Sequence, residues 1–248
     1  MDEETGRPDP EKFALLSADH EPPETTAMNL ALFDLDHTLL PIDSDYTWCQ
    51  FLIKTGILNA TEYEERNQRF YEQYKAGTLD IYEFLSHQLK PLAQNSRKQL
   101  DSWHERFMQE EIEPHVLPQA VELVQNHLSA GDDCILVTAT NSFVTRPIAT
   151  RFGIAHLIGT EPESRDGEFT GGVHGTPSFR EGKVTRTHDW LSSRGKNWSD
   201  YERVYFYSDS INDLPLLEKA THPVATNPDD RLAAIAQQRN WSILKLFE

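Results

Sequence analysis

Residues 30–40 read LALFDLDHTLL, a short apolar run that passes directly into acidic and hydroxyl side chains. Uninterrupted apolar residues without a helical period of polar positions are typical of a strand buried on both faces of a sheet. The run ends in Asp34, Asp36 and Thr38, at every second position. The stretch therefore predicts a central strand whose carboxyl end carries two carboxylates.

Two later apolar runs end in polar residues in the same way. The run CILVTAT (134–140) contains Thr138 near its end, and RVYFYSDSIND (203–213) passes into Asp209, Asn212 and Asp213. Lys183 lies between these two runs, in REGKV (180–184). A doubly wound sheet places its active site at the carboxyl ends of its strands, so we expect these side chains to meet at one edge.

The remainder of the chain from about residue 114 alternates between helical and strand-like segments. Repeated βα units predict an α/β protein with a Rossmann-like, doubly wound and mostly parallel sheet. We assign residues 28–42 and 114–248 to this core. A strand is expected at HLIGTE (156–161), a hairpin within GEFTGGVHG (167–175) and one helix at INDLPLLEKA (211–220).

Residues 43–113 contain four amphipathic helical segments separated by Gly, Asn and Pro, with no strand-like run between them. We predict an inserted helical-bundle cap. Its aromatic residues mostly follow helical spacing and are expected to form the interior of the cap; they are Trp48, Tyr63, Phe70, Tyr71, Tyr74, Tyr82, Phe84, Trp103 and Phe107. Residues 1–27 hold eight acidic against two basic side chains and four prolines, which predicts a disordered acidic tail.

The bulk composition excludes several classes of function. The net charge of -17 over 248 residues argues against a nucleic-acid partner, because nucleic-acid phosphates would be repelled. No apolar run is long enough to span a bilayer, so no membrane partner is expected. The two cysteines, Cys49 and Cys134, lie far apart and form no CxxC pair, which fits a reducing cytoplasm.

The residue types at the strand ends favour phosphoryl transfer. A carboxylate can attack phosphorus and form an aspartyl-phosphate, which divides a difficult hydrolysis into two easier steps. A second carboxyl group nearby, Asp36, can protonate the leaving oxygen and then deprotonate the attacking water. Four converging carboxylates, those of Asp34, Asp36, Asp209 and Asp213, would repel one another without a cation, and Mg²⁺ suits an all-oxygen site of this kind.

Together these elements resemble the haloacid dehalogenase superfamily, and within it the phosphoserine-phosphatase-like branch. That family combines a DxDxT strand end, a strand ending in Ser or Thr, a lysine, and a strand followed by DxxxD, in the order found here over about residues 28–248. The resemblance implies that Asp34 is the nucleophile, and that Mg²⁺ binds Asp34, the backbone carbonyl of Asp36, and Asp209. It also implies that Thr138, Lys183 and Asn212 contact the phosphoryl group, while Asn212 and Asp213 orient the lysine.

Other functions remain open at this point. A phosphomutase or phosphotransferase would use the same aspartyl-phosphate but shield it from water, and an assay for free phosphate separates it from a phosphatase. A binding protein with a vestigial site is disfavoured, because every residue that the chemistry requires is present. A dehalogenase needs no metal and would not carry the Asp34/Asp36 pair.

The substrate is expected to be a small phosphorylated metabolite. In phosphoserine phosphatases a carboxylate nine residues after the nucleophile binds the substrate's amino group, and Asp43 holds that position here. Asp43 and Asp45 would favour a phosphate ester that carries an amine; the equally weighted alternative is that both only cap a helix. His37 replaces a small residue of the motif, and we favour a solvent-facing position over one that narrows the entrance.

Between the amine-bearing candidates, the composition of the early cap favours histidinol phosphate. Phosphoserine needs a cationic partner for its own carboxylate, and residues 43–60 offer only Lys54. Histidinol phosphate carries an amine and an imidazole but no carboxylate, so an acidic and aromatic pocket suits it better. The DSDxxW segment (43–48) is also similar to that of bacterial histidinol-phosphatase-type members of the family. The oligomeric state cannot be derived from the sequence.

Overall fold

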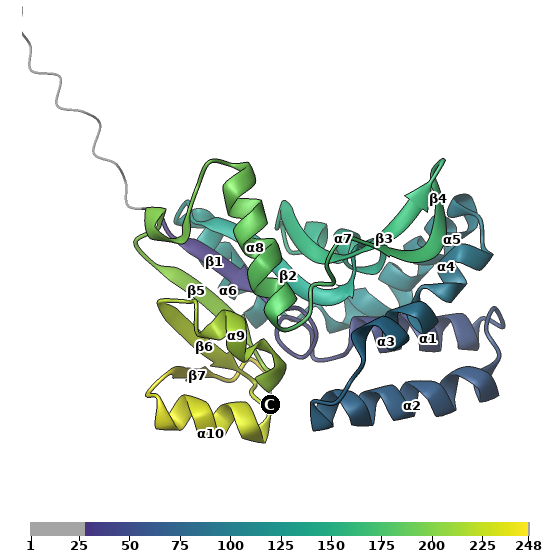
Figure 1. Ribbon diagram of the computed structural model, residues 1–248, viewed down its shortest axis with the longest axis horizontal. Coiled ribbons are helices and arrows are strands. Elements are labelled where there is room, and N and C mark those ends of the chain that lie inside the picture. The colour runs from purple at the N-terminus through teal and green to yellow at the C-terminus, as the bar shows by residue number, and fades with distance from the viewer. Residues whose placement is uncertain (1–27, 248) are drawn as a thin grey trace, which may run out of the picture.

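A seven-stranded sheet in the order β4-β3-β2-β1-β5-β6-β7 forms the centre of the computed structural model, which describes residues 28–247 (Figure 1). Neighbouring strands are parallel, except that β3 and β4 are antiparallel. The predicted α/β class with a mostly parallel sheet is confirmed. The strands are β1 (Leu30–Phe33), β2 (Asp133–Asn141), β3 (His156–Arg165), β4 (Glu168–His174), β5 (Val204–Ser208), β6 (His222–Thr226) and β7 (Ser242–Leu244).

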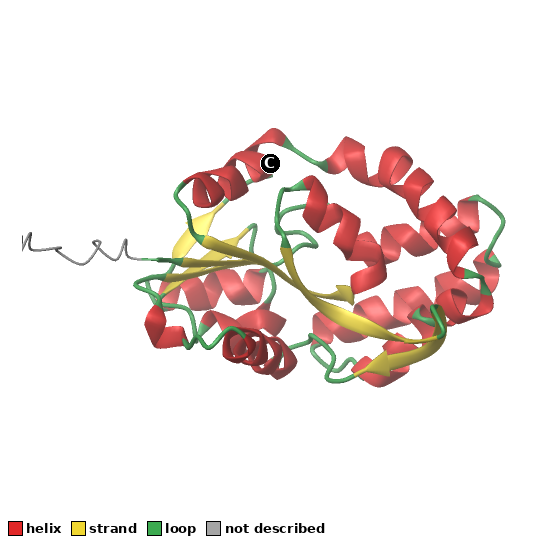
Figure 2. Cartoon of the chain, turned by 90° about the horizontal axis from the view of Figure 1, so that it is seen from above, coloured by secondary structure: helices red, strands yellow, loops and turns green. Residues whose placement is uncertain are grey.

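The apolar run of β1 is explained by its position in the middle of the sheet, with helices on both faces (Figure 2). Alternate residues of a strand face opposite sides of a sheet. Ala31 and Phe33 belong to the core under α6 and α7, and Leu30 and Leu32 to the core under α8, α9 and α10. All four side chains are fully buried. These helices are α6 (Pro118–Ser129), α7 (Ser142–Arg151), α8 (Glu181–Ser193), α9 (Leu214–Leu217) and α10 (Asp230–Gln238).

The chain between β1 and α6 is helical, as predicted. It forms five helices where four were expected, because the third segment ends at Gln88 and a short helix with Pro91 in its first turn follows. Proline cannot continue a helix but fits the first turn of a new one. The helices are α1 (Ser44–Lys54), α2 (Ala60–Ala76), α3 (Ile81–Gln88), α4 (Lys90–Gln94) and α5 (Arg97–Phe107), followed by a π-helical turn (Met108–Ile112) and a 3-10 turn (Glu113–His115).

The helical cap shares its interior with the core domain. The Trp48 ring of α1 lies 5.1 Å from the Phe107 ring of α5 and 5.8 Å from the Phe143 ring of α7, measured between centroids. Trp48 and Phe107 are almost fully buried. Aromatic pairs in this edge-to-face arrangement stabilise a core beyond their burial alone. The side of the cap formed by α1 and α5 is therefore firmly packed against the core domain.

The hairpin expected within residues 167–175 is larger than predicted. β3 continues past its pairing with β2, which ends at Thr160, to Arg165, and β4 returns beside it after a turn at Asp166 and Gly167, which both have positive φ. The glycine-rich stretch is therefore one strand of the hairpin. At Gly171 a Cβ atom would lie 3.2 Å from the Cβ of Ala93 in α4, so the missing side chain lets the hairpin approach the cap closely.

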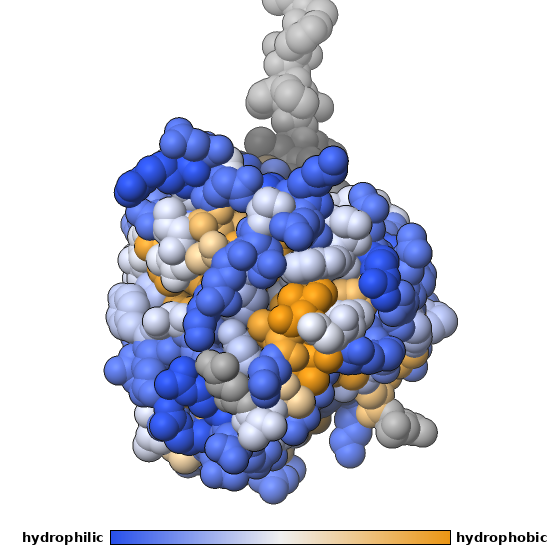
Figure 3. Space-filling model, turned by 90° about the vertical axis from the view of Figure 1, so that its right-hand side faces the viewer, coloured by the Kyte–Doolittle hydropathy of each residue, from blue (hydrophilic) through white to orange (hydrophobic). Residues whose placement is uncertain are grey.

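The predicted helix at 211–220 is also divided. It forms a 3-10 turn (Ile211–Asp213) followed by α9, whose first turn contains Pro215. A further 3-10 turn (Trp198–Asp200) precedes β5. Within residues 28–247 none of the helices combines the length and apolar character needed to cross a membrane. The end of the molecule formed by the cap is mostly hydrophilic, with an apolar patch at its centre (Figure 3). The predicted acidic tail lies outside the described residues.

Candidate active site

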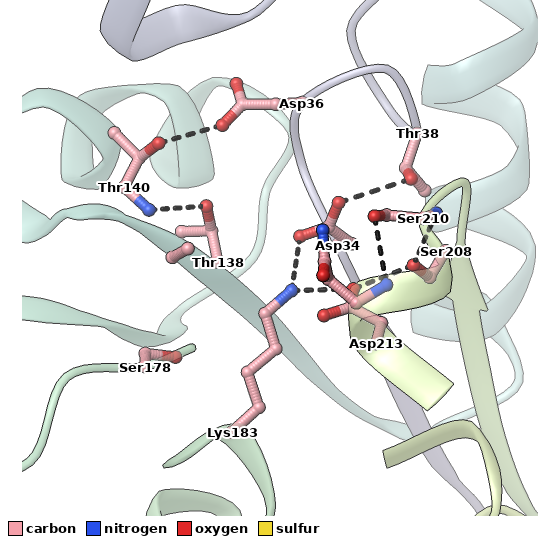
Figure 4. Close-up of polar contacts among 12 residues, drawn as sticks. Asp34, Asp36, Thr38, Thr138, Thr140, Ser178, Lys183, Ser208, Ser210 and Asp213 are labelled. Carbon is pink, nitrogen blue, oxygen red and sulfur yellow. Dashed lines mark hydrogen bonds and ion pairs between the residues drawn. The ribbon is translucent and has the colours of Figure 1, made fainter. Parts of the chain in front are cut away.

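The carboxyl ends of β1, β2 and β5 bring the predicted residues to one edge of the sheet (Figure 4). β1 pairs with both other strands, and the Asp34 N–H continues the ladder by donating to the carbonyl of Tyr207 over 2.9 Å. Asp34 is 7% exposed and Thr138 1%. Residues that lie more than 100 positions apart in the chain thus converge because the parallel pairing aligns their strand ends.

Lys183 is the centre of the buried ionic cluster. Its Nζ lies 2.7 Å from Asp34 Oδ1 and 2.7 Å from Asp213 Oδ2, and the side chain is almost fully buried. Ser208 donates its hydroxyl to the same Oδ2 of Asp213 over 2.7 Å. Asp213 precedes α9 but makes no capping hydrogen bond with its side chain. The Asp213 carboxylate therefore pairs with Lys183 and does not cap α9.

Asp209 reaches this cluster through Thr38. The Thr38 hydroxyl lies 3.2 Å from Asp209 Oδ1 and 3.4 Å from Asp34 Oδ2, and it accepts the backbone N–H of Asp209 over 3.0 Å. One buried hydroxyl group thus lies against both carboxylates. Thr38 is the threonine of the DxDxT motif, and its contacts with both carboxylates explain why a hydroxyl residue stands at this position of the motif.

The carboxylates carry more negative charge than one lysine neutralises. Burial raises the pKa of Asp34 to about 7; the Lys183 ammonium opposes this shift, and the charges of Asp213 and Asp36 add to it. Burial, followed by the charges of Asp34 and Asp213, also raises the pKa of Asp209 well above its ordinary value. Burial lowers the affinity of Lys183 for its proton, but Asp213 and Asp34 outweigh burial and raise its pKa. A further cation near Asp34 and Asp209 would relieve this excess of charge.

Asp36 lies across the loop from Asp34 and points toward Thr140 (Figure 4). Its Oδ2 accepts the Thr140 hydroxyl over 2.8 Å, and its Oδ1 accepts the backbone N–H of Ser44 over 2.7 Å. Burial is the main cause that raises its pKa to about 6, assisted by the charge of Asp43 and opposed by these hydrogen bonds. The environment therefore favours a protonated Asp36 more than water does.

Thr138 and Thr140 both lie on β2 and are joined by a hydrogen bond, and only Thr138 was predicted as a site residue. The Thr138 Oγ1 accepts the backbone N–H of Thr140 over 3.2 Å, which leaves its own hydroxyl hydrogen free to point into the pocket. Thr140 was not singled out in the sequence. The alternation of Thr138 and Thr140 along one strand, which puts both on the same face, is the signal that could have identified it.

Asn212 is placed differently from the expectation that it contacts phosphate. Its Oδ1 accepts the Arg180 guanidinium over 3.0 Å and 3.2 Å, and its Nδ2 donates to the carbonyl of Tyr74 in α2 over 3.3 Å. Asn212 does not line the pocket. The structure therefore places the Asn212 amide between Arg180 of the core domain and Tyr74 of the cap, and the predicted contact of Asn212 with phosphate stays a prediction.

A cavity of about 560 Å³ opens from the carboxylates into the cap. Helices α2 and α3 supply aromatic walls, so part of the aromatic set predicted to form the cap interior faces this cavity. Tyr82, also in that set, is 63% exposed. His37 is exposed and lies at the cavity edge, in a left-handed backbone conformation with a φ of 59°. The principal lining residues from the cap are Asp43, Asp45, Asn67, Phe70, Tyr71, Tyr74, Phe84 and Gln88.

The two candidate substrate carboxylates have different surroundings. Asp43 is the N-terminal cap of α1 and accepts the backbone N–H of Tyr46 over 2.8 Å. Asp45 is 6% exposed; its Oδ1 accepts the Asn141 amide over 3.3 Å, and it forms no ion pair with any residue from 28 to 247. Burial, then the charges of Asp43 and Asp36, raise the pKa of Asp45 well above its usual range. Asp45 is therefore a buried carboxylate without a cationic partner, at the edge of the cavity.

Comparison with known proteins connects this geometry to a family. Residues 31–218 match the haloacid dehalogenase-like hydrolases. The sequence is 48% identical over 217 residues to a histidinol-phosphatase of Neisseria meningitidis serogroup C (strain 8013), which covers 87% of this chain and 98% of that protein. A crystal structure of a protein of unknown function from Bordetella pertussis Tohama I matches with a TM-score of 0.85 at 52% identity, over 89% of this chain and 100% of the other.

A more distant structure shares the fold. A substrate-bound phosphoserine phosphatase matches with a TM-score of 0.62 at 17% identity, over 88% of this chain and 92% of the other. The matches agree on the family and on the fold. They confirm the prediction of a phosphatase of this type, and the chain belongs to the haloacid dehalogenase-like hydrolases.

Proposed function

We propose that the protein removes phosphate from a small phosphate monoester through an aspartyl-phosphate on Asp34, with Mg²⁺ as cofactor, and that L-histidinol phosphate is the substrate. The observation that carries the chemistry is the buried Lys183, which lies 2.7 Å from Asp34 and 2.7 Å from Asp213 at the carboxyl end of the sheet. A lysine in this position neutralises a phosphoryl group as it is transferred to the carboxylate beside it.

In the first step Asp34 attacks phosphorus, and the bond from phosphorus to the leaving oxygen breaks. Asp36 gives its proton to that oxygen, a role that its raised pKa of about 6 supports. Thr138 and Lys183 hold the phosphoryl oxygens. In the second step Asp36 takes a proton from water, which attacks phosphorus and returns Asp34 and free phosphate.

The residues present fit Mg²⁺. Within residues 28–247 no group of three or more His, Cys, Asp or Glu side chains is arranged to hold a metal ion. Asp34 and Asp209, with the backbone carbonyl of Asp36, would instead supply the partial oxygen set that Mg²⁺ completes with waters and substrate phosphate. Burial is the main cause of the raised pKa values of Asp34 and Asp209, and the charges of neighbouring carboxylates add to it, which supports a cation beside them. When bound there, the ion would neutralise charge on the transferring phosphoryl group.

Metal removal tests the class of reaction. Purified protein is expected to release free phosphate from p-nitrophenyl phosphate with Mg²⁺, to lose this activity in EDTA, and to regain it when Mg²⁺ is restored. A colorimetric assay for inorganic phosphate makes the measurement. Full activity after dialysis against EDTA would contradict the metal assignment. Transfer of the phosphoryl group to a second metabolite without release of phosphate would indicate a mutase or phosphotransferase.

The substrate proposal rests on Asp45. A buried carboxylate without a cation, beside a cavity with aromatic walls, matches a ligand that carries an ammonium group and an aromatic ring. Histidinol phosphate has both, and the similar histidinol-phosphatase of Neisseria supports this choice. Phosphoserine is the second candidate, because the exposed Lys75 and Arg231 also line the cavity and could meet its carboxylate.

Asp45→Asn is expected to lower kcat/KM for histidinol phosphate roughly 10- to 100-fold, the range for a lost hydrogen bond to a charged group. For p-nitrophenyl phosphate, which has no amine, the change should stay within about threefold. In Asp43→Asn the asparagine can still cap α1, so this variant removes the charge of Asp43 without removing the helix cap. Asp80→Asn is the matched control, because Asp80 caps α3 from an exposed position. A preference for glucose 6-phosphate, or an equal loss for all substrates in Asp45→Asn, would refute amine recognition.

A further inference from the structure

One wall of the cavity is the C-terminal half of α2, which supplies Phe70, Tyr71 and Tyr74. The N-terminal part of this helix packs on α3, where the Tyr63 and His87 rings lie 4.6 Å apart. Beyond Tyr74 the helix ends at Ala76, and Gly77 follows with a φ of 74°. This end of α2 is the part of the cap nearest to the loop that carries Asp209 and Asp213, as its contacts show.

The contacts between this end of α2 and the core domain are polar, apart from the Tyr74 ring, whose centroid lies 6.3 Å from that of the Phe179 ring. Arg180 donates from Nη2 to the carbonyl of Gly77 over 2.6 Å, and from Nε and Nη2 to Asn212 Oδ1 over 3.2 Å and 3.0 Å. Asn212 Nδ2 donates to the carbonyl of Tyr74 over 3.3 Å, and the Tyr74 hydroxyl donates to Ser210 Oγ over 3.0 Å. Hydrogen bonds of this kind can open without exposing a large apolar surface.

The opposite side of the cap is attached in another way. Trp48 packs on Phe143 of α7, and the His104 ring of α5 lies 2.9 Å, by its Nε2, from the carbonyl of Val144. Arg97 places its guanidinium 4.9 Å from the ring of Phe169 in the hairpin. Buried aromatic packing of this type does not separate at low cost. Movement that admits substrate is therefore expected at the α2 end.

Arg180 is placed by the same turn that places Lys183. A Cβ atom at Gly182 would lie 2.0 Å from the carbonyl oxygen of Pro177, so this turn closes only with glycine there. Arg180 has a φ of 51°, a left-handed conformation that residues with a side chain rarely adopt, and its guanidinium lies 5.0 Å from the ring centre of Phe179. Such strained residues persist where the surrounding structure requires them.

We propose that Arg180 is a positioning residue that fastens the C-terminal end of α2 to the loop at residues 209–213 and so closes the cavity over the phosphate site. The Arg180 latch, defined as Arg180 with Asn212, Gly77 and Tyr74, ties the cap wall to the turn that carries Lys183. When the latch opens, residues 70–79 move away from the core domain while α5 stays in place. This role adds to the proposed hydrolysis and does not depend on which phosphate monoester is the substrate.

Hydrogen exchange measured by mass spectrometry on the full chain tests the latch. In Arg180→Ala, the amides of residues 70–79 are expected to exchange roughly tenfold faster than in wild type, and those of residues 97–107 at the wild-type rate. Arg180→Gly removes the guanidinium but relieves the backbone, and it should show the same local change. Arg239→Ala is the control, because Arg239 binds Glu218 over 2.6 Å outside the cavity.

Three outcomes would overturn the latch. One is exchange at residues 70–79 that stays at the wild-type rate in Arg180→Ala. Another is equal acceleration in residues 97–107, which would mean that the whole cap moves or that the fold is weakened. The third is wild-type exchange in Arg180→Gly, which would assign the effect to backbone strain. Since exchange is measured without turnover, these results stand even if the protein does not hydrolyse histidinol phosphate.

A kinetic readout complements exchange. With p-nitrophenyl phosphate as the probe, Arg180→Ala is expected to raise KM roughly tenfold and to change kcat by less than about threefold, because the groups that react are untouched. A loss confined to kcat would contradict a role in closing the cavity.

Discussion

Asp34→Asn is expected to abolish turnover, with a loss of roughly 10⁴-fold or more, because an amide cannot attack phosphorus and the covalent route closes. The substitution preserves side-chain size, and Asp34 is buried beside Lys183. Steady-state release of phosphate measures the loss. Undiminished activity would falsify the nucleophile assignment.

Asp36→Asn provides the comparison for this result. It should cost roughly 10²–10⁴-fold with an alkyl phosphate, the usual contribution of a general acid or base. With p-nitrophenyl phosphate, whose leaving group departs without an acid, the first step should persist while attack by water slows. Acid-quenched protein should then carry phosphate in Asp36→Asn and none in Asp34→Asn. Phosphate bound to Asp34→Asn would place the nucleophile elsewhere.

Lys183→Met is expected to have the largest effect on stability. Lys183 is the only cationic side chain in ion-pair distance of Asp34 or Asp213 among the residues that the structure describes. Removal of one partner of a buried ion pair leaves uncompensated charge, so the free energy of unfolding should fall by about 3–5 kcal/mol. Activity should fall roughly 10²–10³-fold, as for a lost charge-stabilising donor. Denaturant unfolding and phosphate release measure the two effects.

The destabilisation of Lys183→Met should depend on pH in a definite direction. Asp34 already has its pKa raised from 3.8 to about 7, and loss of the ammonium raises it further. An acid whose pKa is raised by folding contributes less stability as pH increases from its unfolded to its folded pKa. The difference from wild type should therefore be largest above pH 7 and should shrink toward pH 4.

Mg²⁺ and a second lysine provide the controls for this variant. Added Mg²⁺ should raise Tm more in Lys183→Met than in wild type, since it supplies countercharge to the same carboxylates. Lys196→Met removes a partly exposed lysine that binds Asp133 over 2.8 Å, and it should cost less than about 1 kcal/mol. Equal losses in the two lysine variants would show that Lys183 does not neutralise a buried cluster.

The order of the motifs along the chain was sufficient to predict the fold. The run from Leu30 to Phe33 is apolar at every position because both faces of β1 are covered, and this property is local. The alternation of helices and strands then leads to parallel pairing, and parallel pairing aligns the strand ends. Asp34, Thr138 and Asp213 could therefore be placed at one edge without coordinates. Lys183 was identified because it lies between the second and third of these strands in the sequence, where the family pattern has a lysine.

Side-chain direction and contacts between distant segments could not be obtained in this way. Nothing local distinguishes Asp43 from Asp45, yet the helix start uses the first as a cap and buries the second without a cation. Asn212 follows the predicted strand end as expected, but its amide meets Arg180 and Tyr74, 32 and 138 positions away. The pair with Arg180 forms only once the core domain has folded, and the pair with Tyr74 only after the cap has packed against it. The chemistry proposed for the site therefore follows from the sequence, whereas the proposed substrate and the proposed closing of the cavity rest on tertiary contacts between the cap and the core.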